Sequence, residues 1–288
     1  MRSMSRIGLT LVALLLVMGV AAVSVASAQE TAKRPQPDWY TPTFHQEVLA
    51  AGAEGVQVSE ERLNTECPGY ASRGVSAAGC IVEPYGCTAN FIFTDGSSSY
   101  IGTARHCVDD VGDAVVMQVD TTTLAAAGEV VRRTPGDGEP GHDFALVKLY
   151  PDVVEKWGTE PALPVVGGPN GIYDGCSTQP VKYYGHGYGV ATAQGKPEAG
   201  LATNWHDDGY GWTGFGAPGD SGSPVVLADG RAAGNFTHLV VDLDEYPGSD
   251  HAGMRMTAIL DFLGPAYRLV NADRSTSTAA RTSCGSGQ

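Results

Sequence analysis

Short apolar and β-branched runs, separated by turn-forming residues, dominate the middle of the chain. The turn sequences between them, such as TDGSSS, PGDGEPG, GGPNG and LADGR, are rich in Gly, Pro, Asp and Ser. Most runs are too short for a helix and lack helical spacing, so we expect strands. The expected strands are CTANFIF, SYIGTA, AVVMQV, EVVRRT, FALVKLY, PALPVV, PVKYYGHG, GSPVVL and NFTHLVV, all within residues 87–241. Because no helical segments alternate with them, the pattern predicts an all-β sandwich or closed barrels, not a parallel βαβ sheet.

Helical periodicity is found in two places. FHQEVLAAGAEGVQVSEERLN, residues 44–64, contains a pattern that could form a short helix. MTAILDFLGPAYRLV, residues 256–270, places Ile259, Leu260, Phe262 and Leu263 on one face and has a proline near its middle. We expect the better helix at this second position, late in the chain.

The first 28 residues have the order of a secretory signal peptide. Two arginines precede a long apolar run, and Ala26-Ser27-Ala28 supplies the small residues of a cleavage site. The alternative is a retained membrane anchor, because the run is about long enough to span a bilayer. The small-residue end favours cleavage after Ala28, and hence a secreted protein.

The rest of the chain divides by composition into three parts. Residues 29–66 begin Pro-rich and polar, which predicts a pro-segment or N-terminal extension, with a packed arm of the mature domain as the alternative. Residues 67–270 contain the expected strands and form one domain. Residues 271–288 are Ser/Thr-rich and typical of a disordered tail, except that Cys284 could attach them to the domain by a disulfide.

Charge and cysteine content limit the function classes. The formal net charge is −14, and loss of residues 1–28 would lower it to −16 because only two arginines are removed. Such a chain lacks the clustered Lys and Arg that nucleic-acid binding needs. The six cysteines form an even set, and in an extracellular protein we expect them to be paired, although six cysteines allow 15 pairings.

GFGAPGDSGSPVV, residues 214–226, contains a serine that could act as a nucleophile. Such a serine needs an exposed hydroxyl and nearby backbone N–H groups directed at the developing oxyanion. The glycines around the Asp-Ser pair allow the tight turn that arranges these donors. Ser221 is therefore a candidate nucleophile, and the N–H groups of Gly219 and Ser221 are a candidate oxyanion hole, with an ordinary turn as the alternative. Ser223 in place of the last glycine excludes the G-x-S-x-G elbow.

Two other stretches contain the partners that a nucleophilic serine requires. TARHC, residues 103–107, ends a small-residue run in His106, a candidate base. GHDFALVKLY, residues 141–150, starts an alternating strand with Asp143, whose carboxylate could fix the tautomer of a catalytic histidine. His142 adjoins this acid and on a strand would point to the opposite face. Each residue taken alone is explained equally well by a structural role.

TARHC, HDFALV and GDSGSP, in this order, resemble the motifs of bacterial trypsin/chymotrypsin-like serine proteases. The order His, Asp, Ser differs from that of subtilisins and α/β-hydrolases. The resemblance extends over residues 80–268 and implies two six-stranded antiparallel β-barrels, the active site between them, and a C-terminal helix. It implies that Ser221 attacks the carbonyl, that His106 is general base and then acid, and that Asp143 orients His106.

The resemblance also assigns cysteines and substrate-binding strands. GNFTHL resembles the strand that binds the substrate backbone, so Thr237 takes the place of a serine that hydrogen-bonds the catalytic aspartate. YYGHG resembles the strand before the autolysis loop, and AGMRMTAILDFL the last strand and C-terminal helix. The resemblance implies a Cys87–Cys107 bridge beside His106, and we expect Cys67–Cys80 and Cys176–Cys284 for the remaining cysteines.

Departures from the family pattern concern specificity and activation. Phe215 stands where trypsins have the aspartate that selects Lys or Arg, and no cysteine precedes GDSG. We therefore expect an apolar or small P1 residue, with Phe215 at the pocket floor and Leu239 narrowing its mouth. The alternative is an acidic P1 residue bound by His238, as in glutamyl endopeptidases. No IVGG-type activation terminus is present, so Asp220 needs another partner.

Arg105 is a further departure, because the family has a small residue before the histidine. Its guanidinium could act on His106 or pair with Asp109 or Asp110. The acid-rich loops VDDVGD and DLDEYPGSD could hold Ca²⁺, but solvated turns explain them as well, and the histidines lack metal-ligand spacing. The sequon at Asn235 lies on an expected strand.

The sequence thus predicts a secreted serine endopeptidase, made as a zymogen, that acts on protein or peptide substrates. We expect no cofactor and no metal, a monomer, and no nucleic-acid partner or membrane association after signal cleavage. The alternatives are a non-catalytic binding or adhesion protein on the same fold, and an esterase that uses the same triad.

Overall fold

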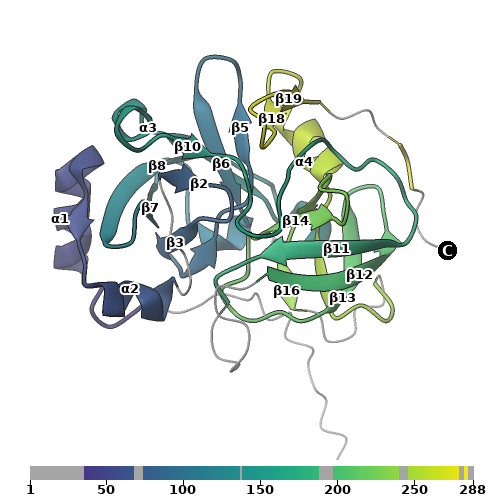
Figure 1. Cartoon of the computed structure of the whole chain (residues 1–288), viewed down its shortest axis with the longest axis horizontal. Helices are drawn as coiled ribbons and strands as arrows, with labels where there is room; N and C mark the ends of the chain where they lie inside the picture. Colours follow the sequence, from purple (N-terminus) through teal and green to yellow (C-terminus); the bar gives the residue numbers. More distant parts are fainter. Residues whose placement is uncertain are drawn as a thin grey trace, which may run out of the picture.

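A computed structural model describes residues 36–67, 74–136, 138–187, 197–239, 246–278 and 282–284. Its two main antiparallel β-sheets lie side by side, with short helices at the periphery (Figure 1). The expected all-β, chymotrypsin-like fold class is confirmed, although short peripheral strands extend both sheets beyond six strands. The expected signal peptide, residues 1–28, lies outside the described residues. No helix among the described residues is long and apolar enough to cross a membrane.

The first sheet carries the strand that leads to His106. Its strand order is β19-β18-β5-β6-β9-β8-β7-β3-β4, and β1 also pairs with β8. The strands are β1 (Val56–Gln57), β3 (Cys80–Glu83), β4 (Cys87–Thr88), β5 (Ile92–Thr94), β6 (Ser99–Thr103), β7 (Ala114–Gln118), β8 (Thr123–Arg133), β9 (Ala145–Leu149), β18 (Arg268–Val270) and β19 (Thr276–Ser277). Because β6 pairs with β9, with Thr103 opposite Ala145, the ends that carry His106 and Asp143 are neighbours.

The second sheet carries the turn that contains Ser221, residues 215–223, which we call the serine turn. This sheet is built around aromatic side chains. Its order is β15-β14-β11-β12-β13-β17-β16. The strands are β11 (Gln179–Tyr184), β12 (Pro197–Trp205), β13 (Gly209–Gly214), β14 (Pro224–Leu227), β15 (Ala232–Asn235), β16 (His238–Leu239) and β17 (His251–Met254). Trp205 stacks on Tyr210 and Tyr210 on Trp212, with ring centroids 4.9 and 5.2 Å apart. These large buried rings supply much of the apolar contact in this sheet. A separate parallel pair joins β2 (Val75–Ser76) and β10 (Thr159–Glu160).

Among the described residues, four α-helices lie around the sheets. They are α1 (Pro42–Ala51), α2 (Glu60–Glu66), α3 (Pro151–Trp157) and α4 (Met256–Leu263). One turn of 3₁₀-helix follows α1 (Gly52–Glu54), a second contains His106 (Arg105–Cys107), and a third directly precedes Asp143 (Pro140–His142). The late helix was expected over residues 256–270, but α4 ends at Gly264, directly before Pro265, and β18 follows. Proline removes a backbone donor and clashes with the preceding turn, so the helix cannot continue through it.

The N-terminal extension is packed on the first sheet. In α1 the Thr41 hydroxyl accepts a hydrogen bond from the N–H of Phe44, and Ser59 caps α2 in the same way. Tyr40, Val48 and Leu63 are buried in one cluster with residues of the first sheet. Residues 36–66 therefore pack against the first sheet.

Two expectations at other positions are corrected. PALPVV, residues 161–166, forms turns and no strand, because it contains two prolines and Val165 has a φ of 63°. Residues 271–278, expected to be disordered, are ordered, with β19 paired to β18.

The disulfides are Cys67–Cys80, Cys87–Cys107 and Cys176–Cys284, which are the expected pairs.

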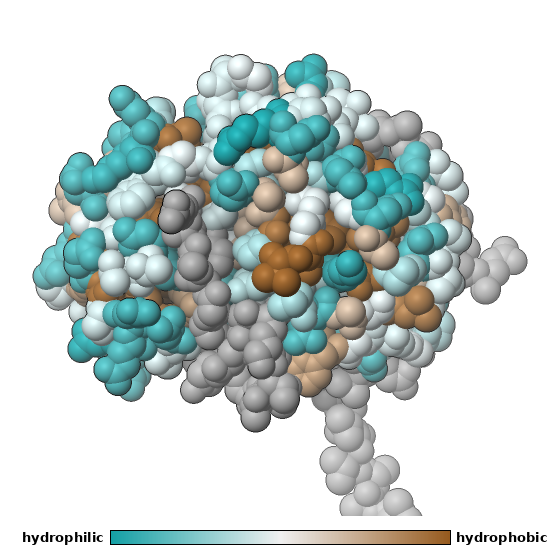
Figure 2. All heavy atoms as spheres, in the orientation of Figure 1, coloured by the Kyte–Doolittle hydropathy of each residue, from teal (hydrophilic) through white to brown (hydrophobic). Residues whose placement is uncertain are grey.

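The surface agrees with the acidic composition. In Figure 2, hydrophilic and intermediate residues cover most of the coloured face, and the largest apolar area lies near its centre. Among the described residues, the large apolar side chains that are well exposed are Val111, Val165 and Leu201. Such a mostly polar surface favours solubility.

Candidate active site

Asp143 and His106 form a buried pair at neighbouring strand ends. The His106 Nδ1 lies 2.6 Å from Asp143 Oδ2, and the His106 backbone N–H donates to Oδ1 at 3.0 Å. Asp143 is fully buried and His106 is 5% exposed. A carboxylate that binds both groups fixes the ring orientation and places the proton on Nδ1, which leaves Nε2 as the basic nitrogen. His142 takes no part in this pair, and its Nε2 lies 3.7 Å from Asp208 Oδ2.

Asn235 holds the main chain of Asp143 from the second sheet. Its side-chain N–H donates to the Asp143 carbonyl oxygen at 3.0 Å, and its Oδ1 accepts from the N–H of Met254 at 3.0 Å. Asn235 is fully buried, so its sequon is not available to a glycan. This role was not predicted from the sequence, because the sequon was the only motif at Asn235. Its place on an expected strand was the signal against glycosylation.

The serine turn reaches the first sheet beside His106. The N–H of Thr88 donates to the Ser221 carbonyl at 2.9 Å, and the Cys107 Sγ lies 3.7 Å from the same oxygen. Gly222, with φ of 92°, leaves no room for a side chain, since a Cβ there would lie 1.9 Å from the Thr88 carbonyl oxygen. Within the described residues, Ser221 Oγ and His106 Nε2 are buried without hydrogen-bond partners, so the two atoms are not bonded to each other.

The two candidate oxyanion donors flank Asp220. Gly219 has φ of 103°, a conformation that favours glycine, and its carbonyl accepts from the Thr88 hydroxyl at 2.9 Å. The backbone N–H groups of Gly219 and Ser221 donate to no residue that the structure describes. They are therefore free to bind an oxygen of a reacting carbonyl.

Asp220 has neutral partners in place of a cation. Its carboxylate accepts from the N–H of Gly187 at 2.7 Å and of Ala217 at 2.9 Å, and the Tyr183 hydroxyl lies at 3.3 Å. Burial raises the pKa of Asp220 to about 7, and the two N–H groups and the hydroxyl act against this rise. The expectation that Asp220 has a partner other than an activation terminus agrees with these contacts.

The contact expected of Thr237 with the catalytic aspartate is absent. The Thr237 hydroxyl donates to the Ala252 carbonyl at 3.1 Å, and His238 is the residue of this strand nearest to the acid, with Nδ1 3.8 Å from Asp143 Oδ2. His238 is buried, its Nδ1 lies 2.8 Å from the Thr237 hydroxyl, and it hydrogen-bonds the backbone of Gly138. Thr237 lies directly before β16, and its side chain contacts that of His238. Burial, and then His106, lower the pKa of His238 to about 4, against the effect of Asp143.

The other residues expected at the specificity pocket lie near the serine turn. Phe215 is half-buried, and its carbonyl accepts from the Tyr183 hydroxyl at 2.6 Å. Leu239 is half-buried at the edge of the aromatic core of the second sheet. No pocket role was predicted for His251. Its ring packs against Gly216, since a Cβ added to Gly216 would lie 2.9 Å from His251 Cε1, and burial lowers the pKa of His251.

Arg105 pairs with neither of the acids considered for it. Its Nε donates to the Thr134 carbonyl at 2.9 Å. Asp109 accepts from the Tyr85 hydroxyl, and Asp110 forms an ion pair with Arg133. Arg105 therefore links the 3₁₀ turn that contains His106 to the loop that precedes Asp143.

The described residues contain one group with the spacing of a metal site, and its chemistry does not fit a metal. It consists of Cys87, His106 and Cys107, and both cysteines are in a disulfide, so no thiolate is available. Of the two acid-rich loops, DLDEYPGSD lies partly outside the described residues.

No family model and no curated protein matches the chain. Similar solved structures include Thermobifida fusca Protease A, with 17% identity, TM-score 0.46, and coverage of 68% of this chain and 98% of that chain. A glutamic acid specific serine protease, described as using a histidine triad in substrate binding, has 20% identity, TM-score 0.42 and coverage of 66% and 98%. A scabies mite inactivated protease paralogue has 15% identity, TM-score 0.43 and coverage of 64% and 90%. These likenesses carry neither activity nor specificity over to this chain, and the fold assignment rests on its own strand topology.

Proposed function

We propose that this chain is a secreted serine endopeptidase. Ser221 attacks the peptide carbonyl while His106 takes its proton, and His106 then protonates the leaving amine. Asp143 orients His106, and the N–H groups of Gly219 and Ser221 stabilise the oxyanion before water releases the acyl group. No cofactor takes part in these steps.

The observation that carries this proposal is the buried Asp143–His106 pair. A carboxylate held by the histidine ring at 2.6 Å and by its own backbone N–H at 3.0 Å is the arrangement that a general base requires. The serine turn lies next to this pair and has two free backbone donors. Three disulfides support an oxidising compartment and hence secretion.

For the P1 residue we propose an apolar or small side chain. The half-buried side chain of Phe215 provides apolar surface beside Gly216, and the buried ring of Phe236 packs against Gly216. The engagement of His238 with Thr237 and Gly138 argues against a role for it in binding an acidic P1 side chain. A digest of a peptide library checks this, and cleavage restricted to Lys or Arg, or to Glu, would contradict it.

A fluorophosphonate tests the mechanism, because it phosphonylates an activated serine. We expect the secreted wild-type protein to take one label on Ser221 and Ser221→Ala to take none. Ser223→Ala is the matched control, since it removes a buried hydroxyl from the same turn and should leave the labelling intact. Equal labelling of wild type and Ser221→Ala would refute the proposal. Matched ester and amide substrates separate a peptidase from an esterase.

One observation favours the alternative of a non-catalytic binding protein. Ser221 Oγ and His106 Nε2 are not hydrogen-bonded to each other. In enzymes without substrate, catalytic hydrogen bonds are often long and tighten only in the complex, so we favour the peptidase. A folded, processed wild-type protein that takes no label would establish the alternative.

A further inference from the structure

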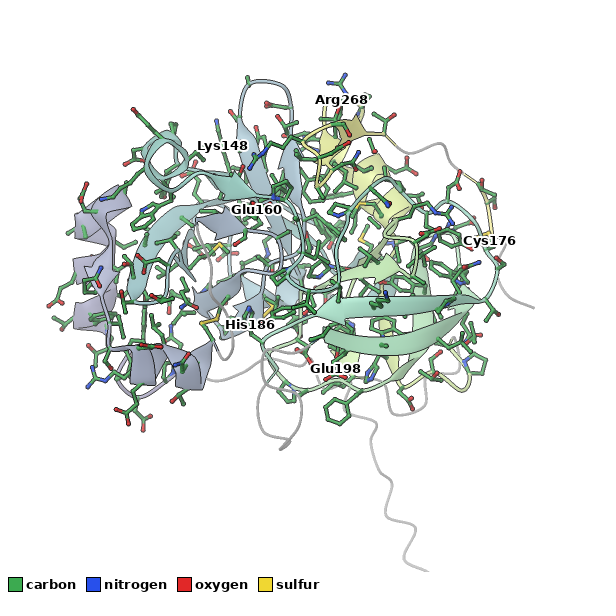
Figure 3. The ribbon with its side chains drawn as sticks, in the orientation of Figure 1. Lys148, Glu160, Cys176, His186, Glu198 and Arg268 are labelled. Atoms are coloured by element: carbon green, nitrogen blue, oxygen red, sulfur yellow. A yellow bond between two sulfur atoms is a disulfide. The ribbon has the colours of Figure 1, made fainter. Side chains whose placement is uncertain are left out.

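The turn that carries the candidate oxyanion hole rests on a polar cluster between the two sheets. The Thr88 hydroxyl donates to the carbonyl of Gly219 at 2.9 Å and accepts from the N–H of His186 at 3.0 Å. Figure 3 shows His186 at the junction of the two sheets. The backbone of His186 and Gly187 also packs against Gly219, since a Cβ on Gly219 would lie 2.9 Å from the His186 carbonyl oxygen. The position of the turn therefore depends on groups that do not reach the substrate.

Tyr183 supplies the contact in this cluster that joins both ends of the serine turn. Its hydroxyl lies 2.6 Å from the carbonyl oxygen of Phe215, where the turn begins, and 3.3 Å from Asp220 Oδ2, next to Ser221. The ring is 1% exposed and stacks on Phe236 with centroids 5.5 Å apart. The burial of the ring and its stacking on Phe236 thus fix the hydroxyl between the two oxygens.

A hydroxyl has one proton and two acceptor lone pairs, so the state of Asp220 decides how it is used. When Asp220 is ionised, both neighbours of the Tyr183 hydroxyl are acceptors, and its proton serves one of them at a time. When Asp220 is protonated, the acid can donate to the Tyr183 oxygen while the Tyr183 proton goes to Phe215. The hydroxyl therefore couples the ionisation of Asp220 to the backbone of residues 215–220.

We propose that Tyr183 is a positioning residue for the oxyanion hole, whose hydroxyl holds the Phe215 carbonyl and the Asp220 carboxylate at a fixed separation. This inference rests on the proposed function. Its consequence is a contribution to kcat without contact with the substrate, because the N–H groups of Gly219 and Ser221 must point at the same oxygen.

The pH dependence supplies a signature that a merely structural role would not produce. Burial raises the pKa of Asp220 to about 7, whereas the Tyr183 hydroxyl lowers it. The titratable groups that act on Asp220 are Tyr183 on β11 and Glu198 on β12, and the ring of His186 in the adjoining loop is bonded to Ala78. Loss of the hydroxyl should therefore move the titration of Asp220 to higher pH.

The experiment compares Tyr183→Phe with Tyr173→Phe in the full secreted chain. Tyr173 is also buried in the second sheet, and its hydroxyl bonds Ser177, away from the serine turn. The readout is the second-order rate of fluorophosphonate labelling between pH 5 and 9. We expect Tyr183→Phe to slow labelling about 10-fold at its optimum, as small misplacements of catalytic groups do. The acidic limb should shift to higher pH, and Tyr173→Phe should match the wild type.

Asp220→Asn keeps the shape of the acid and provides a second test if Tyr183→Phe does not fold. It should label slowly and lose the Asp220 proton from the acidic limb. A wild-type rate and pH profile in either folded variant would overturn the proposal for Tyr183. A wild-type protein that takes no label at all would instead refute the proposed function, and this inference with it.

Discussion

Replacement of Asn235 by alanine tests how the candidate triad is held in place. The side chain bridges the Asp143 carbonyl and the Met254 N–H, each at 3.0 Å, and is completely buried. The change removes a donor and an acceptor at once and leaves both backbone groups without a partner. Water cannot replace the amide unless the site opens, so the cost should appear in both stability and activity.

The magnitude follows from the two lost hydrogen bonds. A buried polar group left without its partner costs about 1–3 kcal/mol, so the variant should lose about 2–6 kcal/mol of unfolding free energy. For a domain of this size, this corresponds to a fall in Tm of about 4–24 °C, since 1 kcal/mol shifts Tm by about 2–4 °C. Displacement of Asp143 should also slow fluorophosphonate labelling about 10- to 100-fold.

Thermal unfolding followed by circular dichroism, together with the labelling rate at 20 °C, measures both effects. Asn271→Ala is the matched control: Asn271 is a buried amide that bonds Ser275 and Ser277 and lies outside the candidate active site. It should lower Tm and leave the labelling rate unchanged. If Asn235→Ala retains the wild-type Tm and labelling rate, Asn235 does not hold Asp143.

Two further predictions concern the serine turn and acid stability. Gly222→Ala would place its Cβ 1.9 Å from the Thr88 carbonyl oxygen, so fluorophosphonate labelling should be lost. The control is Gly96→Ala, which has a similar φ and open space around the Cβ and should lower the free energy of unfolding by only about 1–2 kcal/mol. Labelling of Gly222→Ala at the wild-type rate would contradict the close packing at Gly222. His238 has a pKa lowered from 6.5 to about 4, so the native state stays neutral while the unfolded chain gains a proton. The contribution of His238 to the free energy of unfolding is complete above pH 6.5, and about 3 kcal/mol of it is lost as the pH falls to 4. Between pH 6.5 and pH 4.5, the free energy of unfolding measured in urea should therefore fall less for His238→Gln than for the wild type. An equal fall in the two proteins would contradict the lowered pKa of His238.

The local pattern predicted most of the first sheet and missed several strands of the second, among them β12 and β13. Runs such as AVVMQV and FALVKLY are short, apolar and almost wholly buried, so their composition and the turns that bound them reveal the strands. The sequences of β12 and β13, PEAGLATNW and GYGWTG, contain several glycines and small polar residues and form no such apolar run. They are strands because neighbouring strands on both sides supply their hydrogen bonds, which is a tertiary effect.

The sequence by itself determined the fold class and the order and identity of the three candidate catalytic residues, and the family resemblance of its motifs implied the Cys87–Cys107 pair. These depend on local motifs and on alternation along single strands. The tertiary structure decided the contacts across the sheets: Asn235 beneath Asp143, His238 in the place expected for Thr237, and Tyr183 beside Asp220. Each of these contacts joins residues at least 37 positions apart in the chain. Such contacts depend on strand register and on the packing of one sheet against the other, and local sequence patterns carry no record of either.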